Sequence, residues 1–330
     1  MRLTVFLATF NRLDTLNRTI RSFEKLTMPM TIVIVDNGTD NPECLQLLER
    51  VSKRPVVSKV YSLPRVSSMQ ELTDNFNIAI RDRYQVKTRT HWSAVTDADV
   101  CFDGASTDTL EAYVRLASKT GFSVGPHLRV DGGIPAGYPL RSRVLATESR
   151  LLYRSTMEWL GRVPYSPWQI DTSFHLFRSC REFKRLQMNT VRVGFPFDAM
   201  HLDWYIDVLN PTLDNRIYAL DDRGAVGSWG RNWLRGVWRT WFDEGREALY
   251  QKLLKAPKQT ADLCNASFLL SWCLQYGFGT PADSGASRYH LLRAVPADSV
   301  WQQHQDDWMR MIYDNDFSSL GWDEADTGRR

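Results

Sequence analysis

The feature that most constrains the fold is an alternation of short apolar runs with amphipathic stretches over the first 117 residues. The apolar runs, which predict strands, cover residues 3–8, 30–35, 56–63 and 91–96. Between them, apolar residues recur at spacings of three and four, which is the apolar stripe of a helix. In the stretch after residue 68, Asn75 and Asn77 are expected off that apolar face. The alternation predicts an α/β fold with a doubly wound, mainly parallel sheet flanked by helices.

Polar residues directly follow three of these predicted strands. The first strand runs into Thr9 to Arg12, the second into Asp36-Asn37, and the fourth into Asp97-Ala98-Asp99. The carboxyl ends of parallel strands lie along one edge of a sheet, and ligands of open α/β sheets bind there. The sequence therefore predicts that the three clusters line one site.

The chemistry of these clusters suggests a metal and a nucleotide. Asp97 and Asp99 offer two carboxylates, the oxygen ligands that Mg²⁺ or Mn²⁺ prefers, and leave positions open for a diphosphate. An isolated D-x-D is commonly a solvated loop, but its place after an apolar strand favours the metal. Asp36 can accept hydrogen bonds from a nucleobase imide or a ribose hydroxyl; the alternative is a turn or N-cap acid. Neither a G-x-G-x-x-G after the first strand nor a G-x-x-x-x-G-K-[ST] occurs, which disfavours dehydrogenases and P-loop proteins.

The rest of the chain is less regular. Further strands are expected over 122–130, 173–177 and 191–197, and from about residue 229 the spacing of Trp and Leu predicts helices. We predict one α/β domain over 1–225 and a helical, Trp-rich C-terminal extension over 226–330.

Charge and cysteine content bear on the binding partner and on the cellular compartment of the protein. The net charge of +3, from 41 basic and 38 acidic residues, is too near neutral to define a partner. Residues 141–192 nevertheless hold ten Lys and Arg against four Asp and Glu, which suggests a polyanionic ligand. Five scattered cysteines without a C-x-x-C pair argue against a disulfide framework or a structural zinc. We see neither a signal-peptide cleavage region nor an apolar stretch long enough to span a bilayer, so we expect a cytoplasmic protein.

Taken in order, the three clusters resemble the nucleotide-sugar domain of GT-A fold glycosyltransferases, most closely the broad family 2 type. The resemblance covers residues 1–105 well and extends to about residue 210. It implies a donor such as a UDP-sugar and a divalent cation, Mn²⁺ or Mg²⁺. The residues that it implies for the nucleotide sugar are Thr9, Asn11, Arg12, Asp36, Asn37 and Asp97, and those for the metal are Asp99 and Asp97.

The resemblance also implies a catalytic base. An inverting transfer needs a carboxylate that takes the proton of the acceptor hydroxyl. In the family this acid lies downstream of the metal motif, and here the candidates are Asp198, Asp203 and Asp207. We favour Asp203, because the neighbouring Trp204 and Tyr205 would form a wall for sugar stacking. The family's usual Glu-Asp pair is absent, and His201-Leu202-Asp203 stands in its place. His201 is a candidate metal ligand, and its alternative is a polar or packed side chain.

Two further segments are candidates for contacts with the diphosphate or the acceptor. The first runs from residue 125 into the Arg-rich stretch, and its alternative is a solvated basic helix. The second alternates Trp and Arg over 229–241, and its alternative is a helix whose Trp side chains pack inward. The candidate residues are Arg129, Asp131, Arg141, Trp204, Trp229 and Arg231.

These observations predict a metal-dependent, inverting glycosyltransferase of the hexosyltransferase type that acts on a glycan or glycolipid hydroxyl. Because of the basic centre and the Trp/Arg segment, a second hypothesis is transfer to a hydroxylated base in DNA, as in viral base-modifying glycosyltransferases. A nucleotidylyltransferase shares the α/β layout, but the Gly-rich loop with Arg and Lys after its first strand is absent. A non-catalytic nucleotide-binding or lectin-like module would leave Asp97 and Asp99 without a role.

Overall fold

In a computed structural model, the chain is described over residues 3–84, 91–131, 133–135, 157–170, 173–178, 182–184, 189–206, 212–220, 239–255 and 260–294, with the single positions 138, 141, 144, 145, 147, 148, 236, 237 and 310. The described residues fall into two compact units. The first lies within 1–129, 155–202 and 213–227, and the second within 130–154, 203–212 and 228–330. Each unit is considered by itself.

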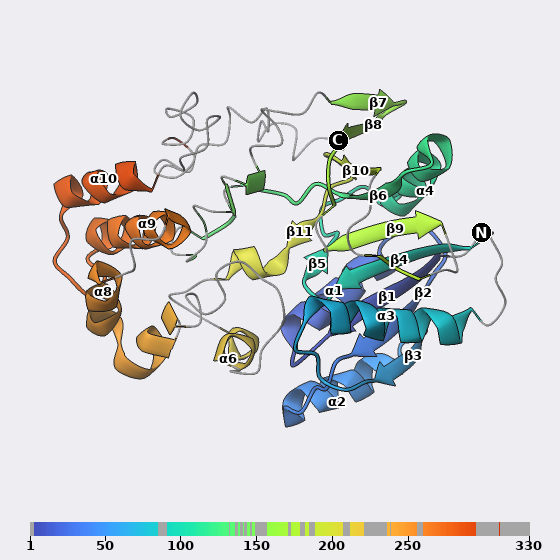
Figure 1. The fold of residues 1–330 in the computed structure, drawn as a ribbon, viewed down its shortest axis with the longest axis horizontal. Helices are drawn as coiled ribbons and strands as arrows, with labels where there is room; N and C mark the ends of the chain where they lie inside the picture. Colours follow the sequence, from blue (N-terminus) through green and yellow to red (C-terminus); the bar gives the residue numbers. More distant parts are fainter. Residues whose placement is uncertain are drawn as a thin grey trace. The chain divides into compact units, whose positions relative to one another are not determined.

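The first unit alternates strands and helices as the hydrophobic pattern predicts (Figure 1). Its first elements are β1 (Leu3–Thr9), α1 (Asp14–Glu24), β2 (Met30–Asp36), α2 (Pro42–Ser52), β3 (Val57–Ser62), α3 (Met69–Arg83), β4 (Trp92–Asp97), β5 (Val100–Cys101), α4 (Thr109–Thr120) and β6 (Ser123–Pro126). Later come β7 (Glu158–Leu160), β8 (Val163–Pro167), β9 (Phe174–Arg178), β10 (Thr190–Val193), β11 (Met200–His201) and α6 (Leu213–Leu220).

Nine strands of the described chain form one sheet, in the order β3-β2-β1-β4-β9-β6-β10-β8-β7. The pairs among β3, β2, β1 and β4 are parallel, and so is the pair of β6 with β10. Strand β9 runs antiparallel to both of its neighbours, β4 and β6, and β8 runs antiparallel to β10 and β7. The predicted α/β class with a mainly parallel sheet is confirmed, with reversed strands at β9 and β8.

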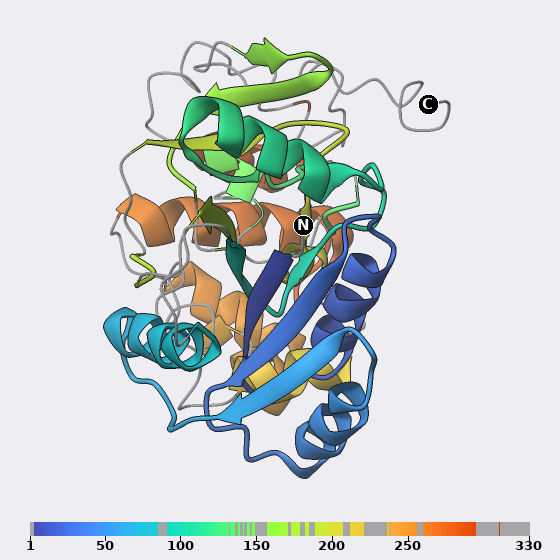
Figure 2. The ribbon, with the colours of Figure 1, turned by 90° about the vertical axis from the view of Figure 1, so that its right-hand side faces the viewer.

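Helices cover both faces of this sheet. Figure 2 shows α1 and α2 on one side of the N-terminal strands and α3 on the other. The stripe of α1, Leu16, Ile20 and Phe23, is fully buried, and the Phe23 ring lies 6.1 Å from the ring of Phe174 in β9. On the opposite face, side chains of α3 share one buried cluster with side chains of β1 and β2: Phe6, Ala8, Val33, Val35, Phe76, Ala79 and Ile80. Since apolar side chains fill both faces, the polar groups of β1, β2 and β4 gather where these strands end.

Local capping fixes where the flanking helices begin. Asn41 Oδ1 accepts hydrogen bonds from the backbone N–H groups of Glu43 and Cys44, and Pro42 occupies the first turn of α2. Ser68 Oγ accepts from the backbone N–H of Glu71 at the start of α3. These caps place α2 and α3 directly after the loops that follow β2 and β3.

One expectation about α3 is wrong. Asn75 and Asn77 do not lie off the buried face, because both are buried, with 7% and 5% of their surface exposed. Each amide is hydrogen-bonded to groups outside the helix, which offsets the cost of removing it from water.

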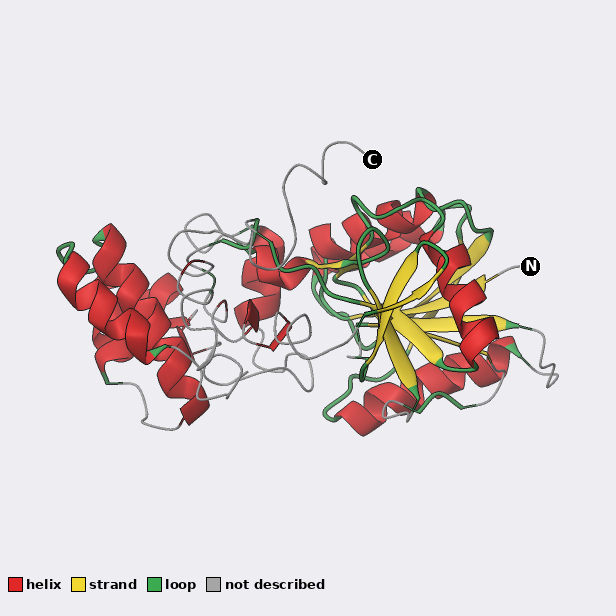
Figure 3. Cartoon of the chain, turned by 90° about the horizontal axis from the view of Figure 1, so that it is seen from above, coloured by secondary structure: helices red, strands yellow, loops and turns green. Residues whose placement is uncertain are grey.

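From residue 239 on, the described elements of the second unit are helices, which confirms the predicted helical character of the C-terminal region (Figure 3). It holds the π-helical turn η2 (Thr240–Glu244) and the helices α8 (Arg246–Leu254), α9 (Thr260–Tyr276) and α10 (Ser284–Arg293). The rings of Trp241 and Trp272 lie 5.9 and 4.9 Å from that of Phe278. The 3₁₀ turn η1 (Leu202–Tyr205) has its first residue in the first unit and its other three in the second. The domain boundary at residue 225 stays a prediction.

Among the helices in the described ranges, none has the length and apolar character needed to cross a membrane.

Candidate functional site

The pairing register brings the three polar clusters to one edge of the sheet. Thr9 pairs with Asp36 across β1 and β2, and Ala8 pairs with Asp97 across β1 and β4. All three strands run in the same direction, so their carboxyl ends form one rim, as the alternation predicts. The N–H of Asn37 donates to the Thr9 carbonyl at 3.0 Å, which joins the first two loops at their base.

Asn11 crosslinks the loops after β1 and β2. Its Oδ1 accepts from the backbone N–H groups of Asp40 and Asn41, both at 3.1 Å, and its Nδ2 donates to Asp40 Oδ1 at 3.0 Å. Its own N–H donates to Thr39 Oγ1. Asn11 has a φ of +45°, a left-handed conformation that Asn tolerates better than most residues. These contacts use both ends of the amide, which favours a role in holding the rim over direct contact with a nucleotide.

Asp99 lies between a cation and an imidazole. Its Oδ2 is 3.3 Å from Arg12 Nη2 and 3.8 Å from His201 Nε2. Arg12 is 5% exposed and Asp99 is 7% exposed, so the ion pair is shielded from solvent. The backbone explains the approach of His201: β11 pairs antiparallel with β5, and the N–H of Leu202 donates to the Asp99 carbonyl at 2.7 Å. Residues 12, 99 and 201, which are distant in sequence, therefore meet at one point of the rim.

This donor set fits a divalent cation that also binds a substrate. Within the described residues there is no group of three or more His, Cys, Asp or Glu side chains that could hold a metal ion. Asp99 and His201 nevertheless bring one carboxylate oxygen and one imidazole nitrogen close together. Mg²⁺ is usually held by one or two carboxylates together with substrate phosphates and water, not by a complete protein cage. Asp97, the other half of the D-x-D, is half-buried, and its backbone N–H donates to the Ser173 carbonyl at 3.2 Å.

Asp36 and Thr9 form the second part of the rim. Asp36 is 3% exposed, and burial raises the pKa of its carboxyl, while hydrogen bonds from Thr39 act in the opposite direction. One of these is the bond from the Thr39 N–H to Asp36 Oδ1, at 3.1 Å. Thr9 Oγ1 is buried and has no hydrogen-bond partner within the described chain. A hydroxyl and a carboxylate at paired positions are suited to the polar edge of a nucleoside.

Asp198, one of the three base candidates, forms an ion pair with Arg129. It is 1% exposed, and Arg129 donates to both of its oxygens, from Nε to Oδ2 at 3.1 Å and from Nη2 to Oδ1 at 2.9 Å. A bidentate Arg–carboxylate pair is among the strongest of charge-assisted contacts. This geometry favours a structural role for both Asp198 and Arg129.

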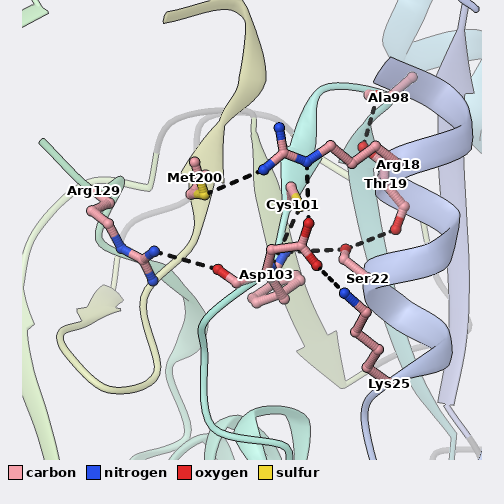
Figure 4. A network of polar contacts seen from close by, with 10 residues as sticks. Arg18, Thr19, Ser22, Lys25, Ala98, Cys101, Asp103, Arg129 and Met200 are labelled. Atoms are coloured by element: carbon pink, nitrogen blue, oxygen red, sulfur yellow. Dashed lines mark hydrogen bonds and ion pairs between the residues drawn. The ribbon is translucent and has the colours of Figure 1, made fainter. Parts of the chain in front are cut away.

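A network that the sequence did not indicate surrounds Asp103 (Figure 4). Arg18 of α1 and Lys25, which directly follows α1, converge on its carboxylate, at 3.1 and 2.6 Å, and Arg129 Nη1 donates to its carbonyl at 3.3 Å. Partial burial opposes ionisation, but the hydrogen bonds from Lys25 and Arg18 lower the pKa of Asp103. The network ties α1 to the turn after β5, four residues beyond Asp99.

The sequence pattern did not indicate a role for Asp214 either. Its carboxylate, 1% exposed, accepts from the N–H of Leu13 at 2.7 Å and from the N–H and Oγ1 of Thr15 at 3.2 and 2.9 Å. It thereby caps α1 from α6, about 200 positions away. No local sequence motif indicates such a contact, because the capping residue and the helix are far apart in sequence.

In the second unit, two of the candidates are buried. Trp204 is 5% exposed and Arg141 is 1% exposed. Burial lowers the pKa of Arg141 to about 10, and its Nη1 donates to the Ile134 carbonyl at 3.0 Å. Asp131 Oδ1 accepts from Tyr205 Oη at 3.1 Å.

The favoured base, Asp203, is half-buried in η1 and follows Leu202 directly in sequence. Three candidates lie outside the described residues: Asp207, Trp229 and Arg231.

No protein-family model matches the chain, and no curated protein matches it either. Among solved structures, the chain is similar to the Pyrobaculum calidifontis mannosyltransferase PcManGT, in complex with GDP-Man and Mn²⁺, with 15% identity over 95% of this chain and 81% of that one and a TM-score of 0.36. It is similar to S. aureus TarS 1–349 in complex with UDP-GlcNAc, with 14% identity, 94% and 82% coverage and a TM-score of 0.36.

GalNAc-T7, with UDP, GalNAc and Mn²⁺, matches with 13% identity, 95% and 58% coverage and a TM-score of 0.40. The chain spans half of the longer TarS structure. These matches cover 94–97% of this chain. At 13–15% identity and TM-scores of 0.40 or less, these similarities carry no conclusion about the chemistry, which depends on the chain's own residues.

Proposed function

We propose that this chain is a glycosyltransferase that takes a sugar from a nucleotide-diphosphate donor bound at the carboxyl ends of β1, β2 and β4. The observation that carries the proposal is the meeting of Arg12, Asp99 and His201 at one point of the rim, beside Thr9 and Asp36. A cation, an acid and an imidazole at this edge suit a diphosphate, while the paired carboxylate and hydroxyl suit a nucleoside.

Each group has a distinct task in this proposal. Asp36 accepts hydrogen bonds from the base or the ribose, and Thr9 Oγ1 supplies a further polar contact. Asp99 and His201 hold a divalent cation, Mn²⁺ or Mg²⁺, with Asp97 in support; when bound, the cation supplies neutralisation of the charge on the departing diphosphate. Arg12 balances the Asp99 charge and attracts the phosphates.

Asp203 is the proposed base. It takes the proton of the acceptor hydroxyl as the oxygen attacks the anomeric carbon, in an inverting transfer of a hexosyl group from a donor such as a UDP-sugar. The alternative bases are Asp207, which lies outside the described residues, and Asp198, which would first have to leave Arg129.

Two cations of the basic segment 141–192 are buried and add nothing to a surface for DNA, so the proposed acceptor is a glycan or glycolipid. Hydrogen bonds within the protein hold Arg141 and Arg192, whereas Arg162, Arg178 and Lys184 of the same segment are exposed. Arg141 and Arg192 are only 1% and 5% exposed. DNA binding depends on exposed cations that contact phosphates, and it would show a steep dependence on salt.

The test is isothermal titration of UDP, and separately GDP, in the presence and absence of Mn²⁺. We expect the wild type to bind one of them in a metal-dependent manner. Asp99→Asn should weaken this binding by at least about tenfold, or about 1.4 kcal/mol, because the amide removes a metal ligand's charge while keeping its shape.

Asp103→Asn is the matched control. It breaks the contacts with Arg18 and Lys25 only four residues from Asp99, so it should leave nucleotide affinity unchanged. Equal affinities of wild type and Asp99→Asn for UDP and GDP, with Mn²⁺ present, would remove Asp99 from the site.

A further inference from the structure

A chain of buried amides lies beneath the rim. Asn75 of α3 donates from Nδ2 to Asn37 Oδ1 at 2.8 Å and to the Pro64 carbonyl at 3.2 Å. Asn37 donates in turn from its own Nδ2 to the carbonyls of Val35, at 3.1 Å, and Thr9, at 3.3 Å. Asn37 is 3% exposed and Asn75 is 7% exposed, so water competes little for these bonds.

The chain of amides joins three loops to one helix. The Thr9 carbonyl ends β1, Asn37 begins the loop after β2, and Pro64 lies in the loop after β3. A backbone bond from the Leu63 N–H to the Asp36 carbonyl, at 2.9 Å, connects the last two loops as well. Asp36 and Thr9, whose side chains form the nucleoside half of the rim, are therefore joined through their backbone carbonyls to a hydrogen-bond network that includes Asn75.

We infer that Asn75 is a positioning residue for the nucleoside part of the donor, an inference that rests on the proposed function. The hydrogen-bond partners of Asn75 explain why an asparagine suits this position. Asn37 Oδ1 and the Pro64 carbonyl are both acceptors, so the position requires two N–H donors on a short side chain. Ala would leave the buried Asn37 Oδ1 and the Pro64 carbonyl without this donor, and Asp would set a carboxylate against them.

Asn77, two residues further along α3, provides a matched comparison. It is 5% exposed and also makes two hydrogen bonds, from Nδ2 to the Phe183 carbonyl at 3.1 Å and from the Phe183 N–H to Oδ1 at 2.6 Å. Its partner belongs to the apolar cluster on the α3 face of the sheet, not to the rim. The two asparagines thus share their helix, their burial and their number of bonds, and differ in what they hold.

The experiment compares Asn75→Ala and Asn77→Ala by thermal unfolding and by titration with UDP, GDP and Mn²⁺-pyrophosphate. Both variants should melt at a lower temperature, because both lose two buried hydrogen bonds. Only Asn75→Ala should also bind its nucleoside diphosphate more weakly, by about tenfold, or about 1.4 kcal/mol. Mn²⁺-pyrophosphate should bind to both variants as to the wild type, because Asp99 and His201 make no contact with Asn75 among their described hydrogen bonds and ion pairs.

Three outcomes would overturn the inference. The first is unchanged UDP and GDP affinity in Asn75→Ala, with binding by the wild type intact. The second is an equal loss in both variants, which would mean that affinity follows general stability. The third is absence of nucleotide binding by the wild type, which would overturn the proposed function as well. If Asn75→Ala does not fold, Asn75→Ser, which keeps one hydroxyl donor, is measured with the same expectation of a selective loss.

Discussion

Asp198 and Asp203 are five residues apart, yet their surroundings permit different chemistry. The Asp198 carboxylate is 1% exposed and receives two hydrogen bonds from Arg129. A general base must reach the proton that it accepts, and it must be free to take up that proton. Asp203, half-buried in η1, meets the requirement of access more easily, so we assign it the proton transfer.

We predict that Asp203→Asn retains donor affinity and loses transfer. The amide has nearly the shape of the acid but cannot accept the hydroxyl proton, so kcat should fall by about 100-fold or more. Steady-state kinetics with an acceptor that the wild type uses, together with UDP titration, would check this. Asp198→Asn should instead lower stability, because Arg129 is left with a neutral partner. Undiminished turnover in Asp203→Asn would move the base to another acid.

At the scale of single elements, contacts between segments that are distant in sequence stabilise the start of an element as much as the local sequence pattern does. The helix α1 begins at Asp14 without a side-chain cap from the residue before it. Its first N–H groups are satisfied by Asp214 from α6 instead. Since the cap and the helix fold from opposite ends of the first unit, formation of α1 in its final place is coupled to the docking of α6.

We predict that Asp214→Ala lowers the free energy of unfolding by about 1–3 kcal/mol, because it leaves several buried donors without an acceptor. Asp14→Asn is the control: this exposed acid in the first turn of α1 acts only on the helix dipole, and its loss should cost less than about 1 kcal/mol. Urea denaturation of the three proteins would compare them. Similar losses in both variants would show that the Asp214 bonds contribute little.

The same distinction explains what could be read from the sequence. The strands β1, β2 and β4 and the polar clusters after them follow from continuous apolar runs, from the 3.6-residue period of the helices between them and from the order of a parallel sheet. Insertion of the antiparallel β9 between β4 and β6 does not, because strands separated by tens of residues carry no signal of their partner. Asn75 was expected off the buried face because its amide is polar; only the coordinates supply the Asn37 and Pro64 acceptors that make its burial favourable.

At the scale of the whole molecule, the 41 basic and 38 acidic residues nearly balance. This total does not show that some of these charges pair with one another inside the protein. Arg12 with Asp99 and Arg129 with Asp198 are shielded pairs within the first unit. Such pairs hold segments that are distant in sequence, and removing one partner is costly because the other charge stays buried. Net charge is consequently a poor guide to the partner of this protein.

Stability of the first unit should also depend on a buried histidine. His127, which follows β6 and is 5% exposed, has its Nε2 3.0 Å from Ser166 Oγ. Burial, with a smaller effect from the Arg192 cation, lowers the pKa of His127 from 6.5 to about 3. The folded protein therefore keeps the imidazole neutral at pH values where the unfolded chain binds a proton.

The sign of the effect follows from proton binding in the two states. Between about pH 6.5 and pH 3 the unfolded state holds one more proton at this position, so the free energy of unfolding falls as the pH falls, by up to about 1.4 kcal/mol per pH unit. His127→Gln keeps a polar group for Ser166 and cannot titrate. Its free energy of unfolding, measured with urea from pH 7 to pH 5, should decline less steeply than that of the wild type, whereas parallel curves would show that His127 is not the group whose protonation opposes folding.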